Sequence, residues 1–466
     1  MRRNIIVSIL MLFAFHTAIA QTTLPSFFSD NMVLQQQSMT SLWGMDKPGT
    51  KISINASWGK TATTVTNKEG HWKLKIQTPV AGGPYTISIK GSKTLNYKNI
   101  LIGEVWLCSG QSNMEMPVKG LNNQPIDGSN EFILNSANDK IRFFKTAQSV
   151  SITPLYDSKG EWKSASPENT GNFSASAYFF AKKIQSILNV PVGIIQTARG
   201  ASFIESWMDA QSLSSFKNYK IPETVPTKDP HRVPTIMYNS MLHPYIGYTI
   251  KGVLWYQGES NREKAFEYKD LFTTMITQWR KQWQQGDFPF YFVQIAPYEP
   301  GNVNAAFLRE AQLQTMLTVK NTGMAVTMDL GEQKVIHPSN KESVGNRLAY
   351  WALANDYNIK GIAYSGPVYK QMEKTADNKI IVSFDFCDMG LSSFGKPFNH
   401  FEIAGEDKVF YPAQAQIHTT KKGALLIWSD SVKNPVSVRY AFKSWAYGSL
   451  FNTQGLPASS FRTDNW

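Results

Sequence analysis

A small polar turn near residue 110 carries side chains that could act as a nucleophile. The apolar run "LIGEVWL" at 101–107 is followed at once by "CSGQSNMEM" at 108–116. The candidates in this turn are Cys108, Ser109 and Ser112, because α/β enzymes place nucleophiles in turns at the carboxyl ends of buried strands. Ser112 does not lie in a Gly-x-Ser-x-Gly elbow, since Met114 stands where the second glycine would be.

Further chemistry-bearing residues follow other apolar runs in the same way. These segments are "ARGASFIESW" at 198–207, "QGESN" at 257–261, "APYEP" at 296–300 and "DLGEQKVIHP" at 329–338. Together with the first turn they supply a serine, a glycine, a glutamine with a glutamate, and a histidine. These are the parts of an acyl-transfer site, namely a nucleophile, oxyanion donors and a general base.

A serine needs a base, and the chain has seven histidines. Outside the first twenty residues and the strand-rich ends of the chain, His231, His243 and His337 remain. His337 precedes the stretch "SNKESVGNRLAYWAL", in which Ser339 and Glu342 predict a capping box at the start of an amphipathic helix. The positive end of that helix would keep the imidazole neutral and ready to accept a proton. His337 is therefore the candidate base, against the alternative of an ordinary loop histidine.

Negative charge that develops on a substrate oxygen needs donors. The backbone N–H groups of Ser112 and Gly200 are candidates, and the Gln257 side chain could supply a third. Glu259 lies in the same loop as Gln257. It has either a direct role or an internal ion pair with Arg199 or Arg262.

The pattern of the chain predicts the elements that position these residues. Between about 99 and 357, five apolar runs alternate with helical stretches, which indicates a mostly parallel sheet covered on both faces. In the stretch "EYKDLFTTMITQWRKQW" the apolar residues recur at helical spacing and predict core packing. Residues 21–98 and 358–466 instead show short alternating runs, so we expect a β-sandwich before the α/β domain and a β-rich region after it.

Composition limits the class of protein. Residues 1–20 carry Arg2 and Arg3, an apolar segment and a small-residue site, which predicts a signal peptide and export to the periplasm or the medium. No later apolar run is long enough to span a membrane. The net charge of +12 is spread along the chain without the basic run of a nucleic-acid arm. The two cysteines are too few for a disulfide scaffold, and two buried thiols are expected.

Three segments together resemble the sialate O-acetylesterase family of carbohydrate esterases, within the SGNH hydrolase superfamily. They are "LCSGQSNMEMP", "WYQGESN" and "IHPSNKESVGNRLA", and supporting pieces such as "NTQGLPASSFRTD" extend the likeness over nearly the whole chain. The resemblance implies a flavodoxin-like catalytic domain with accessory β regions and hydrolysis of acetyl esters on sugars. It implies Ser112 as nucleophile and His337 as base, with Gly200 and Gln257 in the second and third blocks of the superfamily.

One departure from the family pattern concerns the acid that orients the histidine. The superfamily usually has an aspartate three residues before the histidine, where this chain has Lys334. The nearest carboxylates are Glu332 and Asp329. Either one of them bends back to His337, or the site works as a Ser–His dyad with a backbone carbonyl holding the ring; the spacing favours the dyad.

The expected partner is an acetylated carbohydrate, with O-acetylated sialic acid favoured by the basic charge of the chain. The first alternative is an acetyl esterase of plant polysaccharide such as xylan or xyloglucan. An alternative of another class is a carbohydrate-binding protein that keeps the fold without catalysis. No metal or organic cofactor is expected, because the sequence has no His/Cys/Asp cluster at ligand spacing. The oligomeric state is left open.

Overall fold

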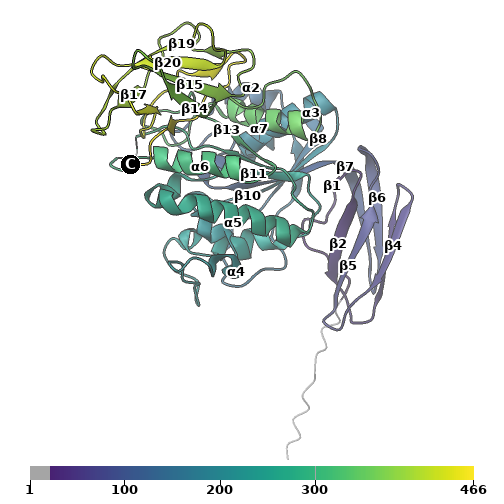
Figure 1. Cartoon of the computed structure of the whole chain (residues 1–466). Coiled ribbons are helices and arrows are strands. Elements are labelled where there is room, and N and C mark those ends of the chain that lie inside the picture. The colour runs from purple at the N-terminus through teal and green to yellow at the C-terminus, as the bar shows by residue number, and fades with distance from the viewer. Residues whose placement is uncertain (1–20, 300) are drawn as a thin grey trace, which may run out of the picture.

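The apolar runs that precede the candidate site residues form one central sheet. The structure is a computed structural model and describes residues 21–299 and 301–466. The sheet runs in the order β13-β12-β11-β7-β10-β8-β9, parallel from β13 to β8 with β9 antiparallel at the edge (Figure 1). The strands are β7 (Thr94–Gly110), β8 (Asn138–Lys145), β9 (Trp162–Ala165), β10 (Val192–Ala198), β11 (Gly252–Tyr256), β12 (Phe290–Val293) and β13 (Thr322–Ala325).

Two pairs of long helices cover the two faces of this sheet. Helices α3 (Ala175–Leu188) and α7 (Lys341–Asn355) pack together in one hydrophobic core, and α5 (Ala265–Trp283) and α6 (Ala306–Thr318) contribute to the other (Figure 1). The aromatic stripe expected in the α5 segment is buried at Tyr268, Phe272, Trp279 and Trp283. The predicted α/β class with a parallel sheet and accessory β regions is confirmed.

Shorter helices occupy the connections between these elements. They are α1 (Ser112–Glu115), α2 (Ser129–Leu134) and α4 (Ala210–Leu213), with further short helical segments at Thr170–Asn172, Ile204–Trp207, Pro230–Arg232, Tyr238–Leu242, His243–Tyr245 and Glu259–Lys264. Helix α7 begins one residue later than predicted. Its N-cap is Asn340, whose side chain accepts from Ser343 N at 3.0 Å, so the predicted capping box of Ser339 and Glu342 is wrong.

The turn that carries Ser112 depends on a glycine at the end of β7. Gly110 has φ 137°, a conformation that L side chains rarely adopt. A Cβ at this position would lie 2.2 Å from the carbonyl oxygen of Tyr256 on the neighbouring strand β11. The missing side chain therefore lets β7 and β11 stay paired while the chain turns into α1.

Strand β7 belongs both to the central sheet and to the amino-terminal β region. Its first part pairs antiparallel with β6, whereas its second part pairs in parallel with β1, β10 and β11. The predicted boundary between residues 98 and 99 falls inside this continuous strand. The other strands of the region are β1 (Val33–Gln35), β2 (Met39–Met45), β3 (Lys51–Ala56), β4 (Lys60–Val65), β5 (His71–Gln77) and β6 (Gly82–Lys90).

The carboxyl-terminal strands form separate sheets on the other side of the α/β domain (Figure 1). Among the described residues, these strands share no sheet with the amino-terminal region, a point that the sequence left open. They are β14 (Val368–Lys374), β15 (Ile380–Asp385), β16 (Leu391–Ser392), β17 (Phe401–Ala404), β18 (Phe410–Pro412), β19 (Gln414–Ile417), β20 (Ala424–Trp428), β21 (Ser437–Tyr440), β22 (Phe451–Asn452) and β23 (Phe461–Arg462).

Both cysteines are buried and free, as expected, so they form no disulfide. The predicted signal peptide at 1–20 lies outside the described residues. Within the described ranges, no helix combines the length and apolar character required to cross a bilayer.

Candidate active site

Ser112 and His337 lie in hydrogen-bond contact although 225 positions separate them in the chain. Ser112 is the first residue of α1, directly after the Gly110 turn, and His337 lies in the loop between β13 and α7. The distance from His337 Nε2 to Ser112 Oγ is 2.7 Å. The other two candidate nucleophiles, Cys108 and Ser109, are fully buried. A nucleophile and a base thus meet at the carboxyl edge of the sheet.

The other ring nitrogen of His337 binds the side chain of Gln124. His337 Nδ1–H donates to Gln124 Oε1. Gln124 closes a tight turn in which it exchanges two backbone hydrogen bonds with Leu121, at 2.9 and 3.0 Å. An amide oxygen only accepts, so it holds the proton on Nδ1 and leaves Nε2 free to accept from the serine. The third member of the arrangement is therefore an amide from a loop that the sequence did not single out.

Neither carboxylate considered for this position contacts the histidine. Glu332 Oε1 accepts from Ser339 N at 2.8 Å, so its carboxylate braces the loop on which His337 lies. Asp329 forms a two-point ion pair with Arg347, at 2.7 and 2.6 Å, which ties the end of β13 to α7. The prediction that Glu332 or Asp329 bends back to the ring is wrong. The alternative, a backbone carbonyl at Nδ1, is also wrong, because the acceptor is a side chain.

A buried polar cluster holds the loop on both sides of His337. Asn113 Nδ2 donates to Ile336 O at 3.1 Å and to Glu259 Oε1 at 2.5 Å. Lys341 Nζ donates to Pro338 O at 2.6 Å and to Asn113 Oδ1 at 2.8 Å. The buried side chains of Asn113 and Lys341 therefore hold the carbonyls immediately before and after His337. Such contacts to the flanking backbone restrict the position of the ring.

Glu259 takes neither of the two arginine partners considered for it. It forms no ion pair with Arg199 or Arg262 among the described residues, and Arg199 instead donates to Gln148 Oε1 at 2.5 Å. Burial raises the pKa of the Glu259 carboxyl, while Asn113 and the charge of Lys341 oppose that rise. Burial also lowers the pKa of Lys341 to about 7, against the attraction of Glu259. Glu259 and Lys341 therefore act on each other through their charges, and Asn113 binds both of them.

Of the two backbone groups predicted as oxyanion donors, one is free of intrahelical bonds and the other already has an acceptor. Ser112 N–H, at the first position of a helix, has no intrahelical acceptor. Gly200 N–H donates to Glu115 Oε2 at 2.6 Å. A Cβ at Gly200 would lie 3.2 Å from that oxygen and 3.5 Å from Ser112 Cβ. Gly200 is thus beside the serine, and the carboxylate of Glu115 occupies its amide.

The structure does not bring the Gln257 side chain to this position. Its Nε2 donates to Ser202 O at 3.1 Å and to Asn261 Oδ1 at 2.7 Å, and its Oε1 accepts from Tyr268 at 2.8 Å. The residue is completely buried, and both amide protons are used. Gln257 therefore supports the loop after β11 rather than offering a free donor.

Ser112 and His337 open into a cavity of about 550 Å³. Two arginines, Arg232 and Arg262, line this cavity. Arg232 lies over the ring of Phe203 and Arg262 over the ring of Tyr298. Neither guanidinium belongs to an ion pair within the described part of the chain. Glu259 and Glu263 line the cavity as well, so the site presents two guanidinium groups and two carboxylates around the serine and the histidine.

The environment of His337 keeps its ring neutral. Burial, helped by the positive charge of Lys341, lowers the pKa of His337 to about 4. The largest cause of this shift is desolvation, whereas the sequence had suggested the positive end of the helix. The other two candidate histidines lie elsewhere: His243 Nδ1 contacts Leu155 O at 2.8 Å, and His231 is buried. In the described ranges, no group of three or more His, Cys, Asp or Glu side chains could hold a metal ion.

Sequence reasoning missed four residues that shape the site. Asn113 and Glu115 lie inside the "CSGQSNMEM" stretch, and Lys341 lies three residues after the "IHP" motif, so proximity to a recognised motif could have marked them. Gln124 had no such signal. It lies in a polar turn, "LNNQP", that reads as an ordinary loop.

Comparison with known proteins places the chain among esterases. The family model described as "Carbohydrate esterase, sialic acid-specific acetylesterase" matches residues 102–354, a segment that contains both Ser112 and His337. Sialate O-acetylesterases of mouse and human are 28% and 27% identical over 90% of this chain, covering 89% and 87% of their own lengths. The crystal structure of a carbohydrate acetylesterase from Xanthomonas citri is 36% identical, with a TM-score of 0.87 over 96% of this chain and 100% of that chain.

Proposed function

Since the chain belongs to the sialic acid-specific acetylesterase family of carbohydrate esterases, we propose that this carbohydrate O-acetylesterase removes acetyl groups from O-acetylated sialic acids through an acetyl-enzyme on Ser112. The observation that carries the mechanism is the 2.7 Å contact between Ser112 Oγ and His337 Nε2 in an open cavity. This is the geometry in which an imidazole accepts the proton of an attacking hydroxyl.

In the first half of the reaction, Ser112 Oγ attacks the acetyl carbonyl carbon while His337 Nε2 takes its proton. Gln124 holds the proton on Nδ1, so the ring presents the correct nitrogen. The tetrahedral intermediate then collapses, and the imidazolium returns the proton to the sugar oxygen as the alcohol leaves. The acetyl group remains on Ser112 as an ester.

In the second half, water takes the place of the sugar alcohol. His337 removes a proton from the water, the resulting hydroxide attacks the acetyl carbon, and the proton returns to Ser112 Oγ as acetate leaves. The negative oxygen of both intermediates rests on the N–H of Ser112 and on that of Gly200. The second donor becomes available when the Glu115 carboxylate is displaced from it.

The substrate part of the proposal is supported by the two arginines of the cavity. Sialic acids carry a carboxylate, and a guanidinium binds a carboxylate with strong, charge-assisted hydrogen bonds. Arg232 and Arg262 form no ion pair in the described structure and line the same cavity as the serine, together with Glu259 and Glu263.

Substitution of the nucleophile tests the mechanism. Ser112→Ala is expected to lower acetate release from p-nitrophenyl acetate by at least about 10³-fold, because within the described ranges Ser112 has the hydroxyl that contacts His337 Nε2. The matched control is Ser109→Ala, three residues earlier in the chain. The Ser109 hydroxyl is buried without a hydrogen-bond partner, so its loss should leave the rate nearly unchanged. An unchanged rate in Ser112→Ala would overturn the assignment.

A substrate comparison tests the choice of sugar. Acetate release is measured from O-acetylated sialic acid and from acetylated xylan under the same conditions. Faster release from sialic acid, abolished in the charge-removing variant Arg232→Gln, supports the proposal. Preference for xylan would assign the enzyme to plant polysaccharide, and release from neither substrate would favour a binding protein.

A further inference from the structure

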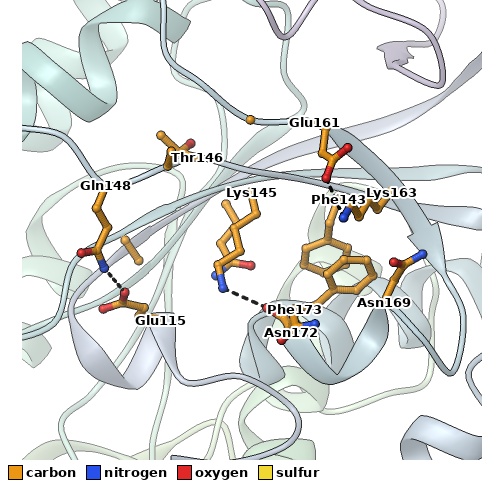
Figure 2. A pocket seen from close by; sticks show the side chains of 14 residues that line it. Glu115, Phe143, Lys145, Thr146, Gln148, Glu161, Lys163, Asn169, Asn172 and Phe173 are labelled. Atoms are coloured by element: carbon orange, nitrogen blue, oxygen red, sulfur yellow. Dashed lines mark hydrogen bonds and ion pairs between the residues drawn. The ribbon is translucent and has the colours of Figure 1, made fainter.

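A second cavity, larger than the catalytic one, lies at the same edge of the sheet. Its volume is about 680 Å³, and it lies beyond the ends of β8 and β10, next to the end of β7 where Ser112 lies. Figure 2 shows Gln148 and Glu115 at one side of it, Lys145 in the middle, and Phe143, Phe173 and Asn169 at the other side. Nothing in the proposed reaction uses this space.

The polar groups of the second cavity suit a ligand rich in hydroxyls. Two lysines and two glutamates, Lys145, Lys163, Glu115 and Glu161, line it, so the charges balance and favour a neutral ligand. Lys145 Nζ donates only to the backbone carbonyl of Asn172, at 3.0 Å, and forms no ion pair within the described residues (Figure 2). Such a mixture of donors and acceptors around one space can bind sugar hydroxyls, each of which donates and accepts.

One lining residue of the second cavity has an amide group without a hydrogen-bond acceptor in the described part of the chain. Gln196 on β10 is only 2% exposed, and its Oε1 accepts from Ser174 N at 2.9 Å. No acceptor among the described residues takes the protons of its Nε2. An amide with free protons at a cavity wall can donate to a ligand hydroxyl or to water.

One side chain links the wall of this cavity to the wall of the catalytic one. Glu115 lines the second cavity, and its Oε2 binds Gly200 N–H at the wall of the first. Its other oxygen accepts from Gln148 Nε2 at 2.5 Å. A hydroxyl that donates to Glu115 from the second cavity would compete with Gly200 for the carboxylate. The two spaces would then join beside Ser112.

We propose that the second cavity is a subsite for the neutral sugar linked to the acetylated sugar, and that Glu115 is its contact with the catalytic site. This inference rests on the proposed function, because it takes the sugar in the catalytic cavity to be a sialic acid. A linked substrate fills both cavities, and its neutral sugar draws Glu115 away from Gly200. The enzyme therefore prefers an acetylated sialic acid within a glycan to the free monosaccharide.

Binding measured by calorimetry on the full chain tests the subsite, with N-acetylneuraminic acid and sialyllactose as probes. Sialyllactose is expected to bind about tenfold more tightly, which corresponds to about 1.4 kcal/mol. Ala147→Trp should erase this difference and leave the affinity for the free sugar unchanged, because Ala147 is exposed and lines only the second cavity. Lys145→Met should reduce the affinity for sialyllactose alone.

The matched control is Ala376→Trp, an exposed alanine in the turn between β14 and β15, which should keep the tenfold difference. Equal affinities of the two probes in the unmodified protein would overturn the subsite, as would a difference that survives Ala147→Trp. The proposed function fails by a separate readout, which is the absence of acetate release from O-acetylated sialic acid. Calorimetry of unacetylated probes does not depend on that reaction.

Discussion

At the scale of single residues, the base of this site is oriented by an amide where a carboxylate is usual. A carboxylate at Nδ1 would stabilise the imidazolium, whereas the neutral oxygen of Gln124 fixes the tautomer without adding charge. An amide in the same role occurs in the Cys-His-Asn arrangement of papain-like proteases. With burial and the nearby Lys341 both opposing protonation, His337 is a weak base that stays available at acidic pH.

The pH dependence of the reaction follows from this arrangement. Activity needs neutral His337, whose pKa is lowered to about 4, so kcat/KM is expected to hold from pH 8 down to pH 5 and to fall as the pH drops through about 4. In Gln124→Glu, the added carboxylate favours the imidazolium and should move this acid limb upward by about one pH unit or more. Gln124→Leu should lower kcat about 10- to 100-fold with little change in KM.

Acetate release from p-nitrophenyl acetate between about pH 3 and pH 8 provides the measurement, so that the expected limb near pH 4 lies inside the range. A limb near pH 6.5 in the unmodified enzyme would contradict the low pKa of His337. A limb that stays in place in Gln124→Glu would show that residue 124 does not act on the ring.

Glu115 should slow the reaction, because its carboxylate occupies the Gly200 N–H that the reaction needs as an oxyanion donor. Glu115→Ala frees Gly200 N–H and removes a negative charge beside the position of the oxyanion. We therefore expect kcat for p-nitrophenyl acetate to rise, by up to about tenfold if displacement of the carboxylate costs about 1.4 kcal/mol. The control is Glu131→Ala, in the nearby helix α2 and away from both cavities. A fall in rate would mean that Glu115 is needed to hold the Gly200 loop.

At the scale of elements, three connections at the carboxyl edge of the sheet are joined by one buried cluster. Asn113 comes from α1 after β7, Glu259 from the loop after β11, and Lys341 from the first turn of α7 after β13. Because Asn113 and Lys341 also bind the carbonyls flanking His337, the cluster fixes the position of the histidine loop relative to Ser112. Catalytic geometry and local stability therefore depend on the same contacts.

A double-mutant cycle tests this coupling. Lys341→Met removes a positive charge that acts on the buried Glu259 and two hydrogen bonds, to Asn113 and Pro338, and should lower the free energy of unfolding by about 3 kcal/mol, with a large loss of kcat as Pro338 is released. Adding Glu259→Gln removes the stranded charge, so the double variant should recover most of the stability but not the rate. Urea denaturation gives the first quantity and acetate release the second. Additive losses of stability would show that the two side chains do not interact.

At the scale of the whole molecule, the carboxyl-terminal region is bound to the α/β domain by a buried arginine. Arg309 of α6 is fully buried and donates to Ser460 Oγ at 3.1 Å and to Lys443 O at 2.5 Å. A second link joins Gln294 Nε2, directly after β12, to Ser459 Oγ at 2.7 Å. The terminal strands are thus attached to elements that carry the sheet.

Loss of this attachment should destabilise the whole chain. Arg309→Met keeps most of the side-chain volume but leaves buried acceptors unpaired, which should cost on the order of 3 kcal/mol. We expect a lower thermal midpoint and faster proteolysis of the region after residue 440. Lys320→Met, an exposed change directly after α6, is the control and should alter neither. A normal midpoint in Arg309→Met would show that the region is held by other contacts.

The sequence by itself determined which residues could react and where they would gather. Ser112, Gly200 and His337 each follow an apolar run, and parallel strands bring the residues after such runs to one edge of a sheet. The buried stripe of α5 was also predictable, since helical spacing is a local property. These predictions needed only short windows of sequence.

Only the tertiary structure decided how the reactive residues are held. Gln124 and His337 are 213 positions apart, and nothing local to either residue indicates the pair. The two carboxylates that precede His337 in the chain have other partners. Glu332 accepts from the backbone of Ser339, and Asp329 pairs with Arg347. The continuous strand β7 and the link that Glu115 forms between the walls of two cavities likewise depend on contacts between distant segments, which a local pattern does not encode.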